Sequence, residues 1–328
     1  MRFTVYSAKS YDRSNLLEVS QAAGHEPVFI EARLDATTAQ LATGSAAVCL
    51  FVNDTADAAT LSVLAEVGVR GIALRCAGFN QVDRAAAQRL GIRVARVPTY
   101  APNAIAEHAV GLMLMLNRQL HRAHNRIREG NFSLTGLIGF NLAGKTVAIV
   151  GTGAIGTVTA RIMLGFDCTV VAVDLTPNPE LIAAGVRYVD LPKALAAADI
   201  VSLHVPLSAV TQHLIDRAAI ARLKPGAMLI NASRGGLLDT AAAIDGLKEG
   251  RIGALGLDVY EYEGALFFED RSDRPIVDDV FSRLITFPNV VITGHQAFLT
   301  REALHEIAQT TSGNLTAFAR GEPSPNDL

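Results

Sequence analysis

The sequence predicts an α/β protein built from two doubly wound parallel-sheet domains with a cleft between them. Two observations support this prediction. Short runs rich in β-branched residues alternate with Ala-rich helical stretches in two successive series, and a proline-containing break at residues 98–102 separates the series. Alternation of strand and helix is typical of parallel sheets covered by helices on both faces. A chain of 328 residues is long enough for two such domains.

The first series ends at the break, and the second follows it. We expect first-series strands at residues 3–6, 27–30, 46–52, 71–74 and 92–95. We expect second-series strands at residues 146–150, 169–173, 200–203, 227–230, 254–257 and 290–292. One long helix is expected from about residue 103 towards 129, and a final helix at 301–319 is expected to return to the first domain. The predicted domains are therefore residues 1–101 with 299–328, and residues 102–298.

Composition restricts the classes of protein. A hydrophobic content of 50%, a charged content of 19% and a net charge of −3 are typical of a compact globular protein, without the basic excess that nucleic acid or an anionic membrane would require. The apolar stretch 109–116 is too short to span a bilayer, and residues 1–15 do not form a secretory signal. Cys49, Cys76 and Cys168 fit neither a disulfide framework nor a metal site, so we expect a reducing cytoplasm and no metal.

The strand expected at residues 146–150 runs directly into the sequence Gly-Thr-Gly-Ala-Ile-Gly. In a dinucleotide-binding turn, Gly151 would permit the tight bend, Gly153 would let the backbone approach a pyrophosphate, and Gly156 would let helix and strand pack closely. Asp174 ends the next strand, 23 residues after Gly151 (174 − 151), where a carboxylate would bind the adenosine ribose. The alternative is a glycine turn that binds no nucleotide.

Asp174 also bears on the choice of cofactor. A carboxylate at this position accepts hydrogen bonds from ribose hydroxyls and repels the additional phosphate of NADP. Residues 175–179 contain no Arg or Lys that would bind that phosphate. The sequence therefore predicts a Rossmann-type domain that binds NAD(H).

Three candidate catalytic residues follow strands of the second series. Arg234 precedes two glycines, Glu263 is one of three nearby acids, and His295 follows the last strand. Taken singly, they could be a surface arginine, a solvated acid and a structural histidine. Because the carboxyl ends of parallel strands meet at one edge, we expect them to converge. Reduction of a 2-oxo acid needs a cation for the carboxylate, a proton donor and a carboxylate that keeps the donor protonated, which are the chemistries of Arg234, His295 and Glu263 in turn.

At these residues the chain resembles the D-isomer-specific 2-hydroxyacid dehydrogenase family, over essentially its whole length. The resemblance is closest to the subgroup of fermentative NAD-dependent D-lactate dehydrogenases of bacteria. Relatives acting on glycerate or phosphoglycerate often have a Pro-rich turn after the catalytic Glu and a Pro where this chain has Gly294. The similar segments are residues 51–54, 75–80, 97–100, 106–109, 266–270 and 294–300.

The resemblance implies a role for individual positions. It implies that Arg234 binds substrate, that His295 is the acid/base and that Glu263 is its partner. The implied substrate-binding residues are the backbone of Ala77 and Gly78, in a substrate domain that would be flavodoxin-like, and the side chains of Tyr100 and Phe298. The implied cofactor contacts are Ile155 and Gly156 with the pyrophosphate, Asp174 with the ribose, Val205 and Pro206 on the adenine side, Ala232 and Ser233 on the nicotinamide half, and Asp258 with the carboxamide. Thr211 occupies a position that is often Asn, and its contact is left open.

The remaining histidines have weaker assignments. His204 either lines the adenosine pocket or packs, His108 is expected to be structural, and His121 and His124 are expected on a solvated basic face.

The predicted function is reversible, NAD-dependent reduction of pyruvate to D-lactate by a homo-oligomer, either dimer or tetramer. The alternatives are a dehydrogenase for a bulkier 2-oxo acid and an NAD(H)-sensing transcriptional corepressor.

Overall fold

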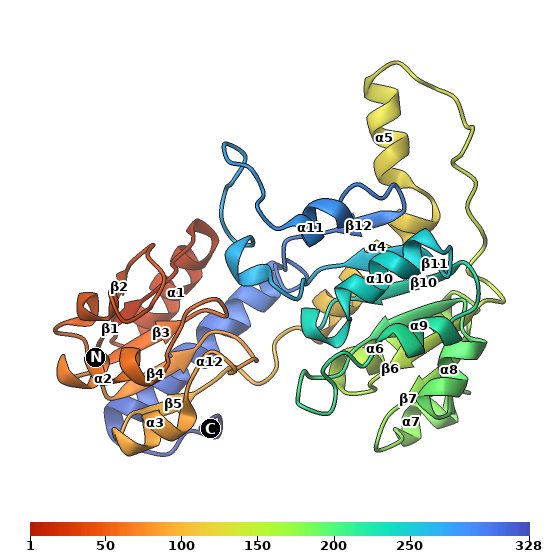
Figure 1. Ribbon diagram of the computed structural model, residues 1–328. Helices are drawn as coiled ribbons and strands as arrows, with labels where there is room; N and C mark the ends of the chain where they lie inside the picture. The colour runs from red at the N-terminus through yellow and green to blue at the C-terminus, as the bar shows by residue number, and fades with distance from the viewer. The chain divides into compact units, whose positions relative to one another are not determined.

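A computed structural model describes residues 1–328, apart from the side chain of Ala265. The chain divides into two compact units, Met1–Ala101 with Phe298–Leu328, and Pro102–Ala297 (Figure 1). Each unit contains one wholly parallel sheet with helices, which confirms the predicted fold class. The second boundary falls one residue earlier than predicted. Phe298 belongs to the first unit, where its ring centroid lies 6.0 Å from that of Phe51 and 6.3 Å from that of Tyr100.

The first unit has a five-stranded sheet in the order β2-β1-β3-β4-β5, which is the flavodoxin-like order. All four residues of both β3 and β4 are buried, as expected for central strands covered on both faces. The strands are β1 (Arg2–Val5), β2 (Glu26–Phe29), β3 (Ala47–Leu50), β4 (Gly71–Leu74) and β5 (Arg93–Ala95). The helices are α1 (Ser10–Ala22), the 3-10 turn η1 (Ala39–Ala42), α2 (Ala58–Glu66), α3 (Arg84–Arg89) and α12 (Arg301–Arg320).

Helix α12 comes from the end of the chain and packs against α1 and β4, so the final helix returns to the first unit as predicted. Thr300 caps its N-terminus by accepting a hydrogen bond from Ala303 N. Its Leu315 is fully buried in a cluster with Phe3 and Val5 of β1. The helix ends at Arg320 and is followed by the capping residue Gly321, which has a left-handed φ of 68°.

The second unit has seven parallel strands in the order β12-β11-β10-β9-β6-β7-β8, so the strand order reverses between β6 and β9. Every predicted strand is present. The additional strand β8 was not predicted because it has only two residues. The strands are β6 (Thr146–Val150), β7 (Thr169–Val173), β8 (Arg187–Tyr188), β9 (Ile200–Leu203), β10 (Ala227–Asn231), β11 (Ile252–Leu257) and β12 (Val290–Ile292). The helices are α4 (Pro102–Asn117), α5 (Leu120–Arg128), α6 (Ala154–Gly165), α7 (Pro179–Ala183), α8 (Leu191–Ala197), α9 (Arg217–Arg222), η2 (Gly235–Leu237), α10 (Thr240–Lys248), η3 (Glu263–Ala265) and α11 (Asp279–Leu284).

The single helix predicted for residues 103–129 is wrong, because the chain forms two helices there. Helix α4 ends at Asn117, and Gln119 adopts a left-handed φ of 47° before α5 begins. The Asn117 side chain hydrogen-bonds both the N–H and the carbonyl of Phe140 at 2.8 Å, which stabilises the break. His124 is exposed as predicted. His121 is not fully solvated, and partial burial lowers the pKa of its imidazole.

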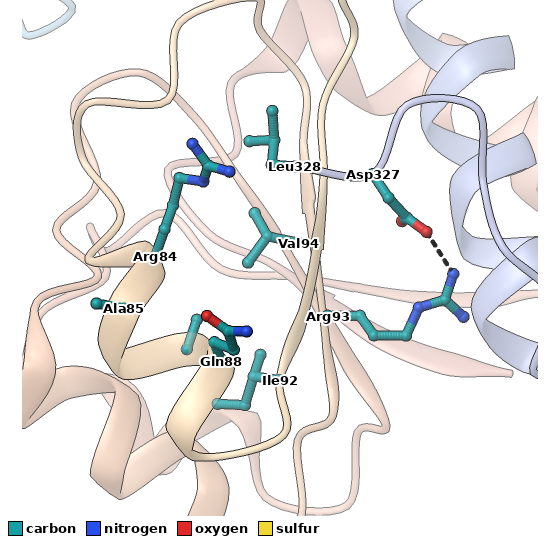
Figure 2. Close-up of a pocket in the computed structure, with 9 residues that line it drawn as sticks. Arg84, Ala85, Gln88, Ile92, Arg93, Val94, Asp327 and Leu328 are labelled. Carbon is teal, nitrogen blue, oxygen red and sulfur yellow. Dashed lines mark hydrogen bonds and ion pairs between the residues drawn. The ribbon is translucent and has the colours of Figure 1, made fainter.

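A hollow of about 530 Å³ lies in the first unit, among α3, β5 and the C-terminal residues (Figure 2). The ion pair between Arg93 and Asp327, at 2.9 Å, lies on the wall of this hollow.

In the part of the chain that the structure describes, no helix is both long enough and apolar enough to cross a membrane.

Candidate active site

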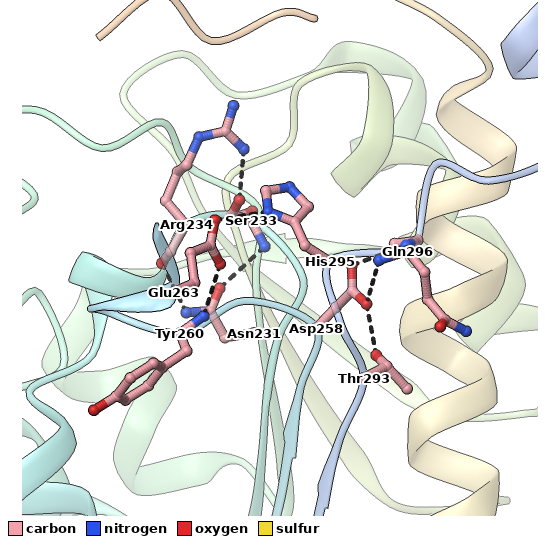
Figure 3. A network of polar contacts seen from close by, with 10 residues as sticks. Asn231, Ser233, Arg234, Asp258, Tyr260, Glu263, Thr293, His295 and Gln296 are labelled. Atoms are coloured by element: carbon pink, nitrogen blue, oxygen red, sulfur yellow. Dashed lines mark hydrogen bonds and ion pairs between the residues drawn. The ribbon is translucent and has the colours of Figure 1, made fainter. Parts of the chain in front are cut away.

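The predicted catalytic residues follow three neighbouring strands whose ends are in register. Asn231 of β10 pairs with Leu257 of β11, and Leu257 pairs with Ile292 of β12. Arg234, Glu263 and His295 come shortly after these strand ends (Figure 3). The parallel sheet therefore delivers all three to one edge, as the sequence predicted.

Glu263 and His295 form a hydrogen-bonded pair, with His295 Nδ1 2.7 Å from Glu263 Oε1. The side chain of His295 is only 14% exposed, and that of Glu263 is only 20% exposed. The second carboxylate oxygen of Glu263 accepts a hydrogen bond from Tyr260 N at 3.0 Å, which fixes its orientation. An imidazole held at Nδ1 by a carboxylate has Nε2 left for proton exchange with a substrate.

Phe268 is a site residue that the sequence analysis did not assign. Its ring centroid lies 5.5 Å from that of His295. The ring thus limits one side of the imidazole and restricts water there. The signal for it was the resemblance of residues 266–270, which named the segment without giving the side chain a task.

The loop that bears His295 is held by a buried carboxylate. His295 has a left-handed φ of 55°, and its N–H donates to the Asp258 carbonyl at 2.7 Å. The fully buried side chain of Asp258 accepts hydrogen bonds from Gln296 N at 2.9 Å, Ala297 N at 2.8 Å and Thr293 Oγ1 at 2.5 Å. This network opposes the strain of the left-handed residue and sets the position of the imidazole.

Asp258 is ionised in this setting. Burial raises the pKa of its carboxyl, but hydrogen bonds from His108, Thr293 and the two loop amides outweigh that effect and lower the pKa. His108 Nε2 lies 3.3 Å from Asp258 Oδ1 and 3.0 Å from Thr293 Oγ1, so this histidine supports the same loop. The contact of Asp258 with a cofactor carboxamide stays a prediction.

The turn that bears Arg234 is fixed by its neighbours. The Asn231 side chain donates to the Arg234 carbonyl at 2.8 Å and accepts from Ser233 N at 3.0 Å. Ser233 Oγ donates to the Leu203 carbonyl at 2.9 Å, which ties the turn to β9. The guanidinium of Arg234 donates to the Ser233 carbonyl at 2.6 Å through Nη1. The remaining donors of the fork can bind a carboxylate.

Gly235 brings this turn against the segment that leads to Glu263. A Cβ at Gly235 would lie 2.1 Å from the Tyr260 carbonyl carbon and 2.4 Å from Glu261 N, so only glycine fits. The carboxylate of Glu261 is engaged elsewhere, by His213 Nε2 at 2.5 Å and Thr240 Oγ1 at 3.1 Å. Of these two nearby acids, it is therefore Glu263 that pairs with His295.

The glycine turn has the geometry that a dinucleotide requires. Gly151 has a φ of 95°, and a Cβ there would lie 2.5 Å from the His204 carbonyl oxygen. A Cβ at Gly156 would lie 1.9 Å from the Gly151 carbonyl oxygen, whereas a Cβ at Gly153 would meet nothing within 4 Å. Helix α6 starts directly after this open position, so its N-terminus can face a pyrophosphate. These residues fit NAD(H), with Ile155 in the first turn of the helix.

The Asp174 carboxylate is hydrogen-bonded to the same glycine turn. Its Oδ2 accepts from Thr152 N at 2.5 Å and Thr152 Oγ1 at 3.0 Å, and its Oδ1 accepts from Thr176 N at 3.1 Å. Partial burial raises the pKa of Asp174, but these hydrogen bonds outweigh burial and lower it. Tyr188 of β8 donates to Thr152 Oγ1 at 2.9 Å. A charged carboxylate is thereby held beside the glycine turn.

The other expected cofactor positions lie around β9 and β10. Val205 and Pro206 follow β9, and Ala232 follows β10. Burial lowers the pKa of His204 to about 4, so its imidazole is neutral, and its Nε2 lies 2.8 Å from Ser202 Oγ. The backbone carbonyl and Cβ of His204 lie against Gly151 and Gly156. Thr211 Oγ1 donates to the Pro206 carbonyl at 2.7 Å, which uses this hydroxyl within its own loop.

The four expected substrate residues lie in the first unit. Ala77 and Gly78 follow β4, and their amide nitrogens donate no hydrogen bond to any residue that the structure describes. Tyr100 and Phe298 pack edge to face, with an interplanar angle of 81°. Amides without an acceptor in the protein are suitable donors for an anion. A role of these four residues in substrate binding stays a prediction.

A glycine turn with a carboxylate at the end of the next strand, and a histidine–carboxylate pair at the same sheet edge, define the class of nicotinamide-dependent dehydrogenases. Residues 110–297 match the model of the NAD binding domain of D-isomer specific 2-hydroxyacid dehydrogenases. The chain belongs to the D-isomer specific 2-hydroxyacid dehydrogenase family, and it is an NAD-dependent enzyme.

Curated relatives and solved structures match the whole chain. The D-lactate dehydrogenase of Escherichia coli (strain K12) is 50% identical over 328 residues, covering 100% of both chains. The apo-structure of D-lactate dehydrogenase from Escherichia coli superposes with a TM-score of 0.92 at 48% identity, covering 100% of both chains. A structure described as the pyruvate reductase of Chlamydomonas reinhardtii has a TM-score of 0.94 at 47% identity, covering 99% of this chain and 98% of that chain.

Proposed function

We propose that this enzyme reduces pyruvate to D-lactate with NADH and catalyses the reverse reaction as well. The observation that supports the proposal most directly is the pair of His295 Nδ1 and Glu263 Oε1 at 2.7 Å, beside the turn of Arg234. The names of the similar proteins, D-lactate dehydrogenase and pyruvate reductase, favour the same substrate pair.

The proposed chemistry assigns one task to each group. Bound NADH supplies a hydride for the carbonyl carbon of the substrate. Protonated His295 donates the Nε2 proton to the carbonyl oxygen, and the Glu263 carboxylate stabilises the imidazolium before that transfer. In the reverse direction, neutral His295 accepts the hydroxyl proton of D-lactate. Hydride and proton together convert the ketone into the alcohol, so charge and atoms balance.

Substrate orientation requires groups that recognise a carboxylate. The guanidinium fork of Arg234 binds a carboxylate at two points and polarises the neighbouring carbonyl. The free amides of Ala77 and Gly78 provide further hydrogen bonds to an anion. Tyr100 and Phe298 would enclose the methyl group of pyruvate and limit the size of the 2-oxo acid.

The experiment that tests the function is the initial rate of NADH oxidation with a panel of 2-oxo acids. Pyruvate is expected to give the highest kcat/KM, and chiral chromatography is expected to show D-lactate as the product. A higher kcat/KM for phenylpyruvate would instead favour the dehydrogenase of bulkier 2-oxo acids. Binding of NADH without turnover of any 2-oxo acid would overturn the proposal in favour of the corepressor alternative.

We also propose that the enzyme is a homo-oligomer. Helix α5 has no buried residue, and the segment after it exposes Phe132, Leu134 and Ile138 by 74%, 80% and 90%. Such a group of exposed apolar side chains favours burial against a second copy of the chain. Light scattering on the purified protein is expected to give the mass of a dimer or a tetramer, and a monomer would contradict this proposal. The cytoplasmic location stays a prediction.

A further inference from the structure

Arg96 contacts the loop of residues 76–79, which follows β4 in the first unit. Its Nη1 donates to the Ala77 carbonyl at 2.9 Å. Its guanidinium carbon also lies 5.1 Å from the ring centroid of Phe79. One side chain therefore holds both the backbone and a side chain of the loop that contains Ala77 and Gly78.

The backbone of this loop has its carbonyls engaged by the protein. The Cys76 carbonyl accepts from Val97 N at 3.3 Å, and the Gly78 carbonyl accepts from Cys76 Sγ at 3.2 Å. Arg96 binds the carbonyl between them. The amides of Ala77 and Gly78, by contrast, have no acceptor among the described residues. The loop thus turns its acceptors towards the protein and leaves donors for a ligand.

The peptide bond between Ala77 and Gly78 contains both the carbonyl that Arg96 holds and the Gly78 N–H that has no acceptor among the described residues. In a trans peptide, the carbonyl and the following N–H point in opposite directions within one plane. By holding the Ala77 carbonyl, Arg96 therefore also sets the direction of the Gly78 N–H. A positive guanidinium on the carbonyl polarises the peptide as well, which makes the N–H a stronger donor.

Arg96 is itself well anchored. Its backbone N–H donates to the Asn326 carbonyl at 3.1 Å, and its carbonyl accepts from the Asn314 side chain at 3.0 Å. Asn314 belongs to α12 and is buried. The side chain that holds the loop thus starts from a fixed backbone.

We propose that Arg96 is a positioning residue for the substrate, which aims and polarises the Gly78 N–H towards the carboxylate of the 2-oxo acid. This inference rests on the proposed function. Binding of the carboxylate is shared by ground state and transition state, so its loss raises KM more than it lowers kcat.

The test compares Arg96→Met with Arg84→Met. Arg96→Met keeps the apolar stem but removes the hydrogen bond and the charge. Arg84 is the matched control, because its guanidinium carbon lies 5.4 Å from the same Phe79 ring and it donates no hydrogen bond to the described residues of the loop. Because Arg96→Met removes a hydrogen bond that involves a charged group, we expect the pyruvate KM of this variant to rise about 10-fold. The KM of Arg84→Met is expected to stay near that of the unmutated enzyme.

Two further measurements separate positioning from a general structural effect. The inhibition constant of oxamate, a non-reacting isostere of pyruvate, should rise together with KM, while the Kd of NADH from fluorescence stays unchanged. Arg96→Lys keeps a charged donor and should recover part of the affinity. If Arg96→Met does not fold, Arg96→Gln replaces it.

The possible results are distinguishable. An unchanged KM and oxamate affinity in a folded Arg96 variant, or an equal loss in Arg84→Met, overturns the inference while the proposed function stands. If the unmutated protein reduces no 2-oxo acid, the proposed function fails and the role of Arg96 fails with it.

Discussion

Replacing Gly235 with Ala should disturb catalysis through the backbone alone. The new Cβ would lie 2.1 Å from the Tyr260 carbonyl carbon, whereas ordinary contact begins at 3.4 Å. The two segments would have to separate by about 1.3 Å (3.4 − 2.1). One segment bears Arg234, and the other leads to Glu263. Because a misplacement of about 1 Å can cost roughly 100-fold in rate, we expect kcat/KM for pyruvate to fall by about 100-fold.

The neighbouring Gly236 provides a matched control. A Cβ there would meet the Gln212 side-chain oxygen at 3.0 Å and a Leu207 methyl group at 3.1 Å, which are the mobile ends of side chains. Neither Gly235 nor Gly236 has a left-handed φ, so the two substitutions differ in the available space and not in backbone preference. Gly236→Ala should therefore retain most of the activity.

Both variants are assayed by steady-state NADH oxidation, with circular dichroism and thermal denaturation to establish that each is folded. NADH affinity is measured by fluorescence, because the glycine turn of residues 151–156 is separate from this contact. A folded Gly235→Ala enzyme with the kcat/KM of the unmutated protein would refute the reasoning. An equal loss in Gly236→Ala would show that the turn tolerates no side chain for some other reason.

Three further predictions concern the charged groups. Asp174→Ala should narrow the preference for NADH over NADPH, because it removes a hydrogen-bond acceptor and a repulsive charge. Since the pKa of Asp174 is lowered, the preference of the unmutated enzyme for NADH should persist at mildly acidic pH. Equal kcat/KM values of the unmutated enzyme for the two cofactors would contradict the role of Asp174. Arg234→Lys keeps the charge but loses the planar fork, so kcat/KM for pyruvate should fall greatly while NADH affinity stays similar; near-normal activity would reduce Arg234 to a structural or long-range electrostatic role. Glu263→Gln removes the charge of the carboxylate that holds His295 Nδ1, so kcat/KM for pyruvate reduction should fall while the Kd of NADH stays unchanged. An unchanged kcat/KM for reduction would exclude this role of Glu263.

Local sequence signals predicted the parts of the fold that depend on short-range patterns. Strands β6 and β7 begin and end at the predicted residues, because an apolar run bounded by a turn defines a buried strand. The break between α4 and α5 was missed because Gln119, which adopts the left-handed φ, is not a glycine. The hydrogen bonds of the neighbouring Asn117 go to Phe140, 23 residues further along the chain, so no local pattern indicates them. Strand β8 is too short to give a periodic signal.

For the candidate site, the sequence likewise predicted what depends on strand order, but not what depends on contacts between distant residues. The order of strands in a parallel sheet was enough to expect Arg234, Glu263 and His295 at one edge. The sequence alone did not distinguish Glu263 from Glu261 by any local pattern, and only the contacts of Glu261 with His213 and Thr240 separate them. Such contacts join residues far apart in the chain, so they depend on the completed fold.

The placement of α12 determines the order in which the two units can form during synthesis. The second unit is one uninterrupted stretch, so its sequence is complete once Ala297 has been made. The first unit needs the last 31 residues (328 − 297), because α12 covers the cluster that contains Phe3 and Val5. Until α12 is synthesised, these apolar side chains of the first strand lack their cover and are open to aggregation. The apolar residues of β1 thus reach their final packing only after those of α12 have been made, later than the point at which the sequence of the second unit is complete.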